Sequence, residues 1–450
     1  MTVGLSQKNR RDLRKGHSPF AGFLRVTRHF FPNLSKQFNQ MQDPRHQSYI
    51  RYSQSSLIWL TLMKCNAGIQ TMRGMTRELN TEEAIENLSI LAESGPMQEK
   101  PDWQTVNNYL EKLAPEQLEE ILFDMTRKLI RTKDYTDYTV DGRYVIVIDG
   151  TDYAHFRKKH CEHDLVRKTV DKESGEVRYD YFHKVLEAKL ILGPGLVISI
   201  GSEFIENEDE NVSKQDCELN AAYRLIRKIK KAFPRLSIVI LGDALYAAIP
   251  FMKAVKECKW DYVFRVKTGR QEKLMEDFED LLNHVEKGDI ISNILPREKG
   301  TGCFVNGVDR VSNKDEICNM VRYANSDTEF NWVSSIEITR SNLSRIIKTG
   351  RDRWKIENEG FNSQKCGIYK LEHLCSLNYN AMKNHYLIVQ IACTLMQLYM
   401  AYDKVVYQLA EGMKHTAREL HISFREHVLD MYDTEFVRTR TALHLCCLLA

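Results

Sequence analysis

The sequence predicts an α/β fold with a helical region at each end, and two observations support this prediction. Hydrophobic residues recur at helical spacing through residues 1–140, change to short apolar or alternating runs at Tyr144, and return to helical spacing after Lys365. In the middle part the runs follow the order of three strands, a helix, a strand, a helix and a strand. The net charge of +3 is too small to imply a nucleic-acid partner by itself.

Residues 1–140 are expected to form a basic, helical, DNA-binding region. Between Met1 and Arg51 ten Lys or Arg residues stand against two acids, which suits a polyanion, although a solvated tail would have the same composition. Asp102 is a predicted N-cap for a helix over Trp103–Leu113, and Pro115 is predicted to begin the next helix. The polar residues on the first of these helices could read base edges in a helix-turn-helix arrangement, or could simply be solvated.

Residues 141–266 are expected to form the first part of the core. Its helices are predicted over a segment that opens with a capping pattern at Ser213 and Asp216, and over Tyr246–Cys258. The predicted strands are Tyr144–Ile148, Lys184–Leu192, Gly195–Phe204, Ile238–Leu241 and Trp260–Val266.

Residues 267–340 interrupt this pattern and are expected to form a β-rich insertion. A helix over Gln271–Leu282 comes first, and three runs separated by Gly, Asn and Asp turns follow it. Residues 341–385 then complete the core, and residues 386–450 are expected to be a C-terminal helical region. The longest apolar run, Tyr386–Tyr402, contains Gln390 and Gln397 and therefore predicts a packed helix rather than a membrane span.

Acidic residues follow two of the predicted strands, and a third lies in a later helix. Asp149 directly follows the first strand, and Asp243 follows Gly242 after the fourth. A lone Asp in such a place is most often a turn or cap residue. In Thr349–Lys365, however, Arg353 and Glu357 are four residues apart, so they share one helical face with Gly360 and Gln364. The plain interpretation of that pair is a surface ion pair.

The segments IDGTD, GDALYA and RWKIEN, in this order, resemble the DDE transposases of bacterial insertion sequences. The resemblance extends from about Tyr144 to Lys365 and is closest to the branch with Y-x2-R-x3-E-x6-K on the glutamate helix. Arg353 and Glu357 match that pattern, whereas Gly350 replaces its Tyr and Gln364 replaces its Lys, with Lys365 one residue late. The resemblance implies a ribonuclease H-like core with a β-rich insertion and a homodimer assembled on DNA.

The same resemblance, with the chemistry of phosphodiesters, predicts a metal site. Asp149, Asp243 and Glu357 are the predicted catalytic residues and would bind two Mg²⁺ or Mn²⁺ ions. Glu187 and Glu218 could support them or be surface charges. Arg353, Lys365 and Lys383 are predicted to contact DNA. Trp332 could stack on an unpaired base, although a Trp in an alternating strand belongs to the core more often.

The predicted function is a DNA transposase that performs metal-dependent strand cleavage and strand transfer at the terminal inverted repeats of an insertion sequence. Two alternatives remain open. One is a catalytically inactive, transposase-derived DNA-binding protein, which the missing Tyr and displaced Lys would fit. The other is a ribonuclease H-like, structure-specific nuclease without strand transfer.

Cysteine usage predicts a reducing compartment and weighs against zinc. The chain has eleven cysteines without CxxC spacing, so we expect reduced thiols in a cytoplasmic, bacterial, nucleoid-associated protein without a membrane partner. Two groups of potential zinc ligands lack the standard spacing of a zinc site. The first group lies in a basic loop, which needs no metal. These groups are His160, Cys161 and His163, and Cys366, His373 and Cys375.

Overall fold

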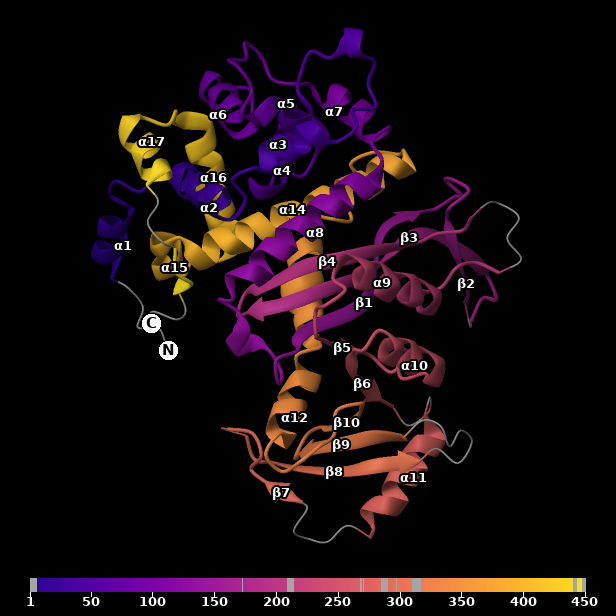
Figure 1. Ribbon diagram of the computed structural model, residues 1–450. Helices are drawn as coiled ribbons and strands as arrows, with labels where there is room; N and C mark the ends of the chain where they lie inside the picture. Colours follow the sequence, from indigo (N-terminus) through magenta and orange to yellow (C-terminus); the bar gives the residue numbers. More distant parts are fainter. Residues whose placement is uncertain are drawn as a thin grey trace.

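A computed structural model describes residues 6–171, 173–208, 214–267, 269, 271–284, 290–296, 298–309, 317–439 and 443–446. A helical body and a long mixed sheet make up the molecule, with the strands of the insertion at the end farthest from the helical body (Figure 1). Residue Ser213, part of the predicted cap of the long core helix, lies outside the described ranges. The helix itself, α9 (Glu218–Ala232), begins after Cys217.

The N-terminal helices begin where the sequence predicts. Asp102 caps α7 by accepting a hydrogen bond of 2.9 Å from the backbone N–H of Gln104, and Pro115 is the first residue of α8. The helices of this region are α1 (Gln7–Arg14), α2 (Pro19–Phe30), α3 (Leu34–Gln40), α4 (Gln54–Asn66), α5 (Met72–Glu78), α6 (Glu82–Ala92), α7 (Trp103–Leu110) and α8 (Pro115–Thr132).

The C-terminal helices pack against these N-terminal helices and form one helical body with them. Phe20 and Phe424 meet edge to face with ring centroids 5.1 Å apart, and Asn87 donates hydrogen bonds to two carbonyl oxygens at the end of α16. In Figure 1 the indigo helix α2 of the N-terminal region lies beside the yellow helices α16 and α17 of the C-terminal region. The C-terminal helices are α14 (Tyr379–Tyr402), α15 (Lys404–Leu409), α16 (Met413–Glu426) and α17 (Met431–Arg438).

Helix α14 is a packed helix, as predicted. It is buried along nearly its whole length, and its polar residues have partners inside the protein. Gln397 accepts a hydrogen bond of 2.8 Å from the backbone N–H of Val197 and donates one to the carbonyl of the same residue. Among the described helices, none has both the length and the apolar character needed to cross a bilayer.

The core sheet has the order β4-β3-β1-β5-β6, which is the order of a ribonuclease H-like fold. Strand β1 is antiparallel to β3 and β3 is antiparallel to β4, whereas β1, β5 and β6 run parallel. The core helices are α9 and α10 (Ile249–Glu257). The strands are β1 (Tyr144–Phe156), β3 (Val177–Gly193), β4 (Leu196–Ile205), β5 (Ile238–Gly242) and β6 (Asp261–Val266).

Two strands are longer than their hydrophobic runs. Strand β1 continues past Ile148 to Phe156, with a bulge between Asp152 and Ala154, and its second half pairs with the first half of β3. Strand β2 (Leu165–Val170) pairs with the same half of β3. Most residues of this outer hairpin are polar and exposed, so hydrophobic periodicity does not reveal it.

The insertion extends the core sheet instead of forming a separate unit. Strand β10 pairs antiparallel with β6, and the sheet continues through β9 and β8 to β7, giving ten strands among the described residues. The predicted helix and strands are present as α11 (Glu272–Leu282), β8 (Gly300–Asp309), β9 (Ile317–Asn325) and β10 (Glu329–Ser334), with β7 (Ile291–Ser292) in addition.

Successive side chains of β1 point to opposite faces of the sheet and therefore belong to two different hydrophobic clusters. Ile146 and Ile148 join the larger cluster, which includes residues of α9 and α10. Val145 and Val147 join a second cluster with α12 (Leu343–Arg351) and the π-helix η4 (Ile356–Phe361). Asp149 has the same parity as Val145 and Val147, so it points toward the side of the sheet that carries η4.

Candidate active site

Parallel pairing of β1 with β5 brings Asp149 and Asp243 to neighbouring positions. The register runs from Tyr144 opposite Ile238 to Val147 opposite Leu241, and each aspartate follows two residues after the last pair, Asp243 directly after the end of β5. Asp149 shares its strand face with Val145 and Val147, and the negative charge of Asp243 acts on its carboxyl. Asp243 also accepts a hydrogen bond of 2.8 Å from the backbone N–H of Leu245, which holds its carboxylate at the strand end.

Glu357 lies in the π-helix η4, so the prediction of one continuous α-helix over Thr349–Lys365 is wrong. Helix α12 ends at Arg351, a turn includes Arg353, and α13 (Asn362–Lys365) follows η4. Ile356 and Phe361, five residues apart, are both buried in the second hydrophobic cluster. A π-helix aligns residues five apart, whereas an α-helix would turn one of them away from the core.

Arg353 connects Glu357 to Asp149. Its Nη1 lies 2.6 Å from Oε1 of Glu357 and 3.7 Å from Oδ2 of Asp149. The side chain of Glu357 is 49% exposed, whereas those of Arg353 and Asp149 are 20% and 23% exposed. The guanidinium therefore stands between the two carboxylates, and Glu357 is the more accessible and more adaptable of the two.

The charge environment of Asp149 is unfavourable for an ionised carboxylate. Its pKa is raised to about 7, first by burial and then by the negative charges of Glu218 and Asp243, while Arg353 and the N–H of Gly150 offset part of the increase. A buried carboxyl with too little positive charge around it is typical of functional sites. A cation bound beside Asp149 would stabilise its ionised form.

Glu218 is a fourth acid at this site, and the sequence left its role open. It is the first residue of α9, and its carboxylate accepts a hydrogen bond of 2.6 Å from the hydroxyl of Tyr246 and pairs with Lys184 Nζ at 2.6 Å. A Cβ at Gly150 would meet the ends of the Glu218 and Lys184 side chains, so these two side chains lie directly over the residue after Asp149. The sequence signal for this contact is the Asp-Gly pair itself.

The donor set of Asp149, Asp243 and Glu357 fits a hard divalent cation. It consists only of carboxylate oxygens, which Mg²⁺ and Mn²⁺ prefer, and the pKa of Asp149 is raised by burial and by the charges of Glu218 and Asp243, which a bound cation would counteract. Among the described residues these acids are not gathered as closely as a complete set of ligands around one ion. The reason is the position of Arg353, since Glu357 is bonded to its guanidinium.

The other predicted DNA contacts have partners within the protein. Lys365 pairs with Glu372 at 2.9 Å, and Lys383 pairs with Glu206 at 3.3 Å. Trp332 is only 2% exposed and belongs to the second hydrophobic cluster, so it is a core residue and cannot stack on a base while β10 is folded.

The departures from the Y-x2-R-x3-E-x6-K pattern have structural causes. A Cβ at Gly350 would lie 2.6 Å from two indole atoms of Trp332, so no room is left there for a tyrosine. Gln364 is fully buried and donates a hydrogen bond of 2.8 Å to Gln390 Oε1, which also accepts one from Lys189. A lysine at position 364 would place two buried cations side by side.

Comparison with known proteins finds that part of this chain is similar to a transposase domain. Residues 206–395 match the family model described as Transposase DDE domain, a span that includes Asp243 and Glu357 and is less than half of the chain. One similar solved structure is a piggyBac transposase synaptic complex with hairpin DNA, determined by cryo-electron microscopy. It has 14% sequence identity and a TM-score of 0.42, and the similarity covers 96% of this chain and 84% of that one. None of the curated proteins matches this chain. The domain match supports a DDE transposase.

Proposed function

We propose that this chain is a DNA transposase that cleaves DNA strands at the terminal inverted repeats of a bacterial insertion sequence and joins the freed ends to target DNA. The observation that carries the proposal is that Asp149 and Asp243 each lie two residues past the last pair of β1 and β5 in a ribonuclease H-like sheet, with Glu357 linked to Asp149 through Arg353. The transposase DDE domain match over two of these acids supports it.

Asp149, Asp243 and Glu357 would hold two divalent ions, Mg²⁺ or Mn²⁺. Bound ions of this kind activate the attacking oxygen and stabilise the departing one. Asp149, whose pKa is raised to about 7, is partly protonated at neutral pH, and a neighbouring cation favours release of that proton. Arg353 is positioned to bind a phosphate with the guanidinium edge that does not contact Glu357.

DNA is the proposed partner, in the form of the terminal repeats and the target. Joining two ends of one element requires two active sites, which motivates a homodimer on DNA. The bacterial nucleoid is the corresponding proposed location. The helical body formed by α1–α8 and α14–α17 is the proposed recognition region for the repeats, since it carries the basic N-terminal segment.

A cleavage and joining assay tests this function. Purified protein is incubated with DNA that carries candidate terminal repeats, with Mg²⁺, with Mn²⁺ and without divalent ions. We expect nicked and joined products only with metal, and loss of both in Asp149→Ala and Glu357→Gln. Glu359→Gln is the matched control. It lies on the same π-helix but accepts a hydrogen bond from the backbone N–H of Gly195, so it should keep activity.

The same assay distinguishes the alternatives. Nicking without joined product would indicate a structure-specific nuclease. Specific binding that Asp149→Ala leaves unchanged, with no cleavage under any metal, would indicate a DNA-binding protein that has lost catalysis. Either result would refute strand transfer as the function of this chain.

A further inference from the structure

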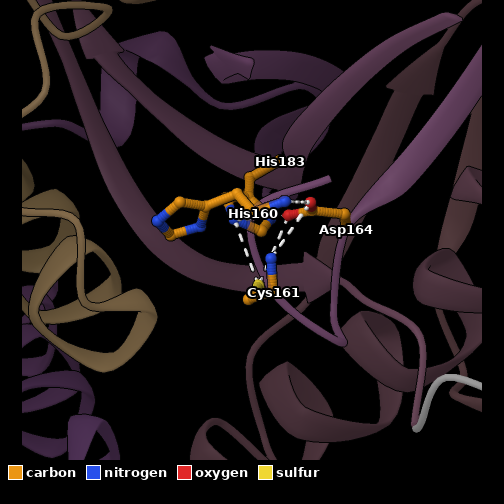
Figure 2. A group of neighbouring side chains, drawn as sticks. All are labelled: His160, Cys161, Asp164 and His183. Atoms are coloured by element: carbon orange, nitrogen blue, oxygen red, sulfur yellow. Dashed lines mark hydrogen bonds and ion pairs between the residues drawn. The ribbon is translucent and has the colours of Figure 1, made fainter. Parts of the chain in front are cut away.

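Four metal-binding side chains meet away from the carboxylates of the candidate active site. His160, Cys161 and Asp164 lie in the connection between β1 and β2, and His183 lies on β3. One potential ligand atom of each residue lies within 4.8 Å of those of the other three. Figure 2 shows these side chains grouped around Cys161 and Asp164.

The distances among three of these side chains fit a tetrahedral zinc ion. Zinc bonds of about 2.0–2.3 Å place neighbouring ligand atoms about 3.3–3.8 Å apart. His183 Nε2 lies 3.3 Å from Oδ1 of Asp164, Cys161 Sγ lies 3.3 Å from the same oxygen, and Cys161 Sγ lies 3.8 Å from His183 Nε2. Three of the four ligand atoms thus already form one face of such a tetrahedron.

The surroundings support a closed metal site. The side chains of His183 and Asp164 are 0% and 1% exposed. The ring of Phe156 stacks on His160 at 4.3 Å, and that of Tyr379 lies 4.4 Å from His183. These aromatic walls leave little space for solvent, and an apolar shell of this kind limits solvent access to a metal.

The hydrogen bonds of the group leave some of its histidine nitrogen atoms without a partner among the described residues. Asp164 Oδ2 accepts from the backbone N–H groups of His160 and Cys161, which fixes the loop around the carboxylate. The Nδ1 atoms of both histidines are buried and have no hydrogen-bond partner within the described parts of the chain. Within the group His183 Nε2 has partners in Asp164 and Cys161, whereas the buried His160 Nδ1 has none among the described residues, so this nitrogen is available to a bound ion.

We propose that His160, Cys161, Asp164 and His183 bind one structural zinc ion that ties the loop after β1 to strand β3. The mixture of nitrogen, thiolate and a single carboxylate selects zinc over Mg²⁺, and four protein ligands leave no open position for a substrate. The site is independent of the proposed transposase function, because none of its residues belongs to the carboxylate site.

The position of the site indicates what it stabilises. It lies at the base of the β2–β3 hairpin, whose exposed basic residues and those of the preceding loop include Arg157, Lys158, Lys159, Arg167, Lys168 and Arg178. We call this hairpin and the preceding loop the basic arm. A bound ion would fix the basic arm to the sheet without a larger hydrophobic core. The sequence favoured a metal-free loop because His183 is 19 positions beyond Asp164. His163, the apparent third ligand, instead contacts the backbone oxygen of Asn207.

Metal analysis of the full chain tests the proposal. Protein purified without chelator should contain about one zinc per chain by plasma mass spectrometry. Cys161→Ser should weaken zinc affinity at least about tenfold in competition with a chromophoric chelator. Cys258→Ser replaces another half-buried cysteine, outside the group, and should leave affinity unchanged. Removal of zinc should speed tryptic cleavage within the basic arm.

Cobalt substitution provides a readout that does not require the variant to fold. Co²⁺ added to metal-free wild-type protein should give the absorption of a tetrahedral site with a thiolate-to-cobalt charge-transfer band. Absence of that band, or equal zinc affinity in wild type and a folded Cys161→Ser variant, would overturn the proposal. Displacement of bound zinc by millimolar Mg²⁺ would also contradict it.

Discussion

Replacing Asp149 by asparagine should stabilise the protein when no divalent ion is present. In the folded chain this carboxyl is mostly buried, with Glu218 and Asp243 nearby and only Arg353 and the N–H of Gly150 to offset them. Asparagine has nearly the same shape and carries no charge, so it removes the cost of ionisation in this environment. The substitution should therefore raise the free energy of unfolding while it removes a proposed metal ligand.

The size and sign of the effect follow from the pKa of Asp149. An increase from 3.8 to about 7 corresponds to about 4 kcal/mol, because each pKa unit is worth 1.36 kcal/mol. The folded state binds this proton more tightly than the unfolded state does. The contribution of Asp149 to wild-type stability should thus be highest below pH 3.8 and fall through the interval up to about pH 7. The asparagine variant lacks this loss, so its advantage should grow by about 2 kcal/mol between about pH 5.5 and 8.5.

Urea unfolding followed by circular dichroism at several pH values, with chelator present, measures this difference. Asp149→Ala is a useful comparison, because it removes the charge but also leaves a cavity and an unpaired N–H at Gly150. The reasoning would be refuted by an asparagine variant that is no more stable than wild type at pH 8. A stability difference that does not change with pH would refute it equally.

Three further predictions follow from the contacts of single residues and from the carboxylate site. At pH 8, Mg²⁺ or Mn²⁺ at 100 times its Kd should stabilise wild type by about 2.7 kcal/mol in thermal scans but leave the asparagine variant nearly unchanged; equal effects would contradict metal binding there. Gly350→Ala should destabilise the fold by about 1–3 kcal/mol, because its Cβ would meet Trp332, whereas Gly360→Ala has a nearest contact of 3.6 Å and should be tolerated. Lys189→Met should cost about 3–5 kcal/mol in chemical unfolding, because it leaves the buried Glu187 carboxylate without its cation; a double variant with Glu187→Gln should recover part of this loss.

The sequence by itself determined the class of fold and the order of its elements. Alternating and helical hydrophobic patterns reflect which side of each element is buried, so β1, β3, β4, α9, β5, α10 and β6 could be predicted in order, as could the helix and strands of the insertion. Caps such as Asp102 and Pro115 act locally and were also visible. The acids could be selected as candidates because Asp149 and Asp243 follow apolar strands.

Only the tertiary structure decided how these pieces meet. Pairing of β10 with β6 joins the insertion to the core sheet, and the spacing of Ile356 and Phe361 gives Glu357 a π-helix. The charges around Asp149 come from residues 69 to 204 positions away along the chain. His183 joins the proposed zinc site from another strand. Periodicity records only local burial, whereas strand register and side-chain packing determine which distant residues share one site.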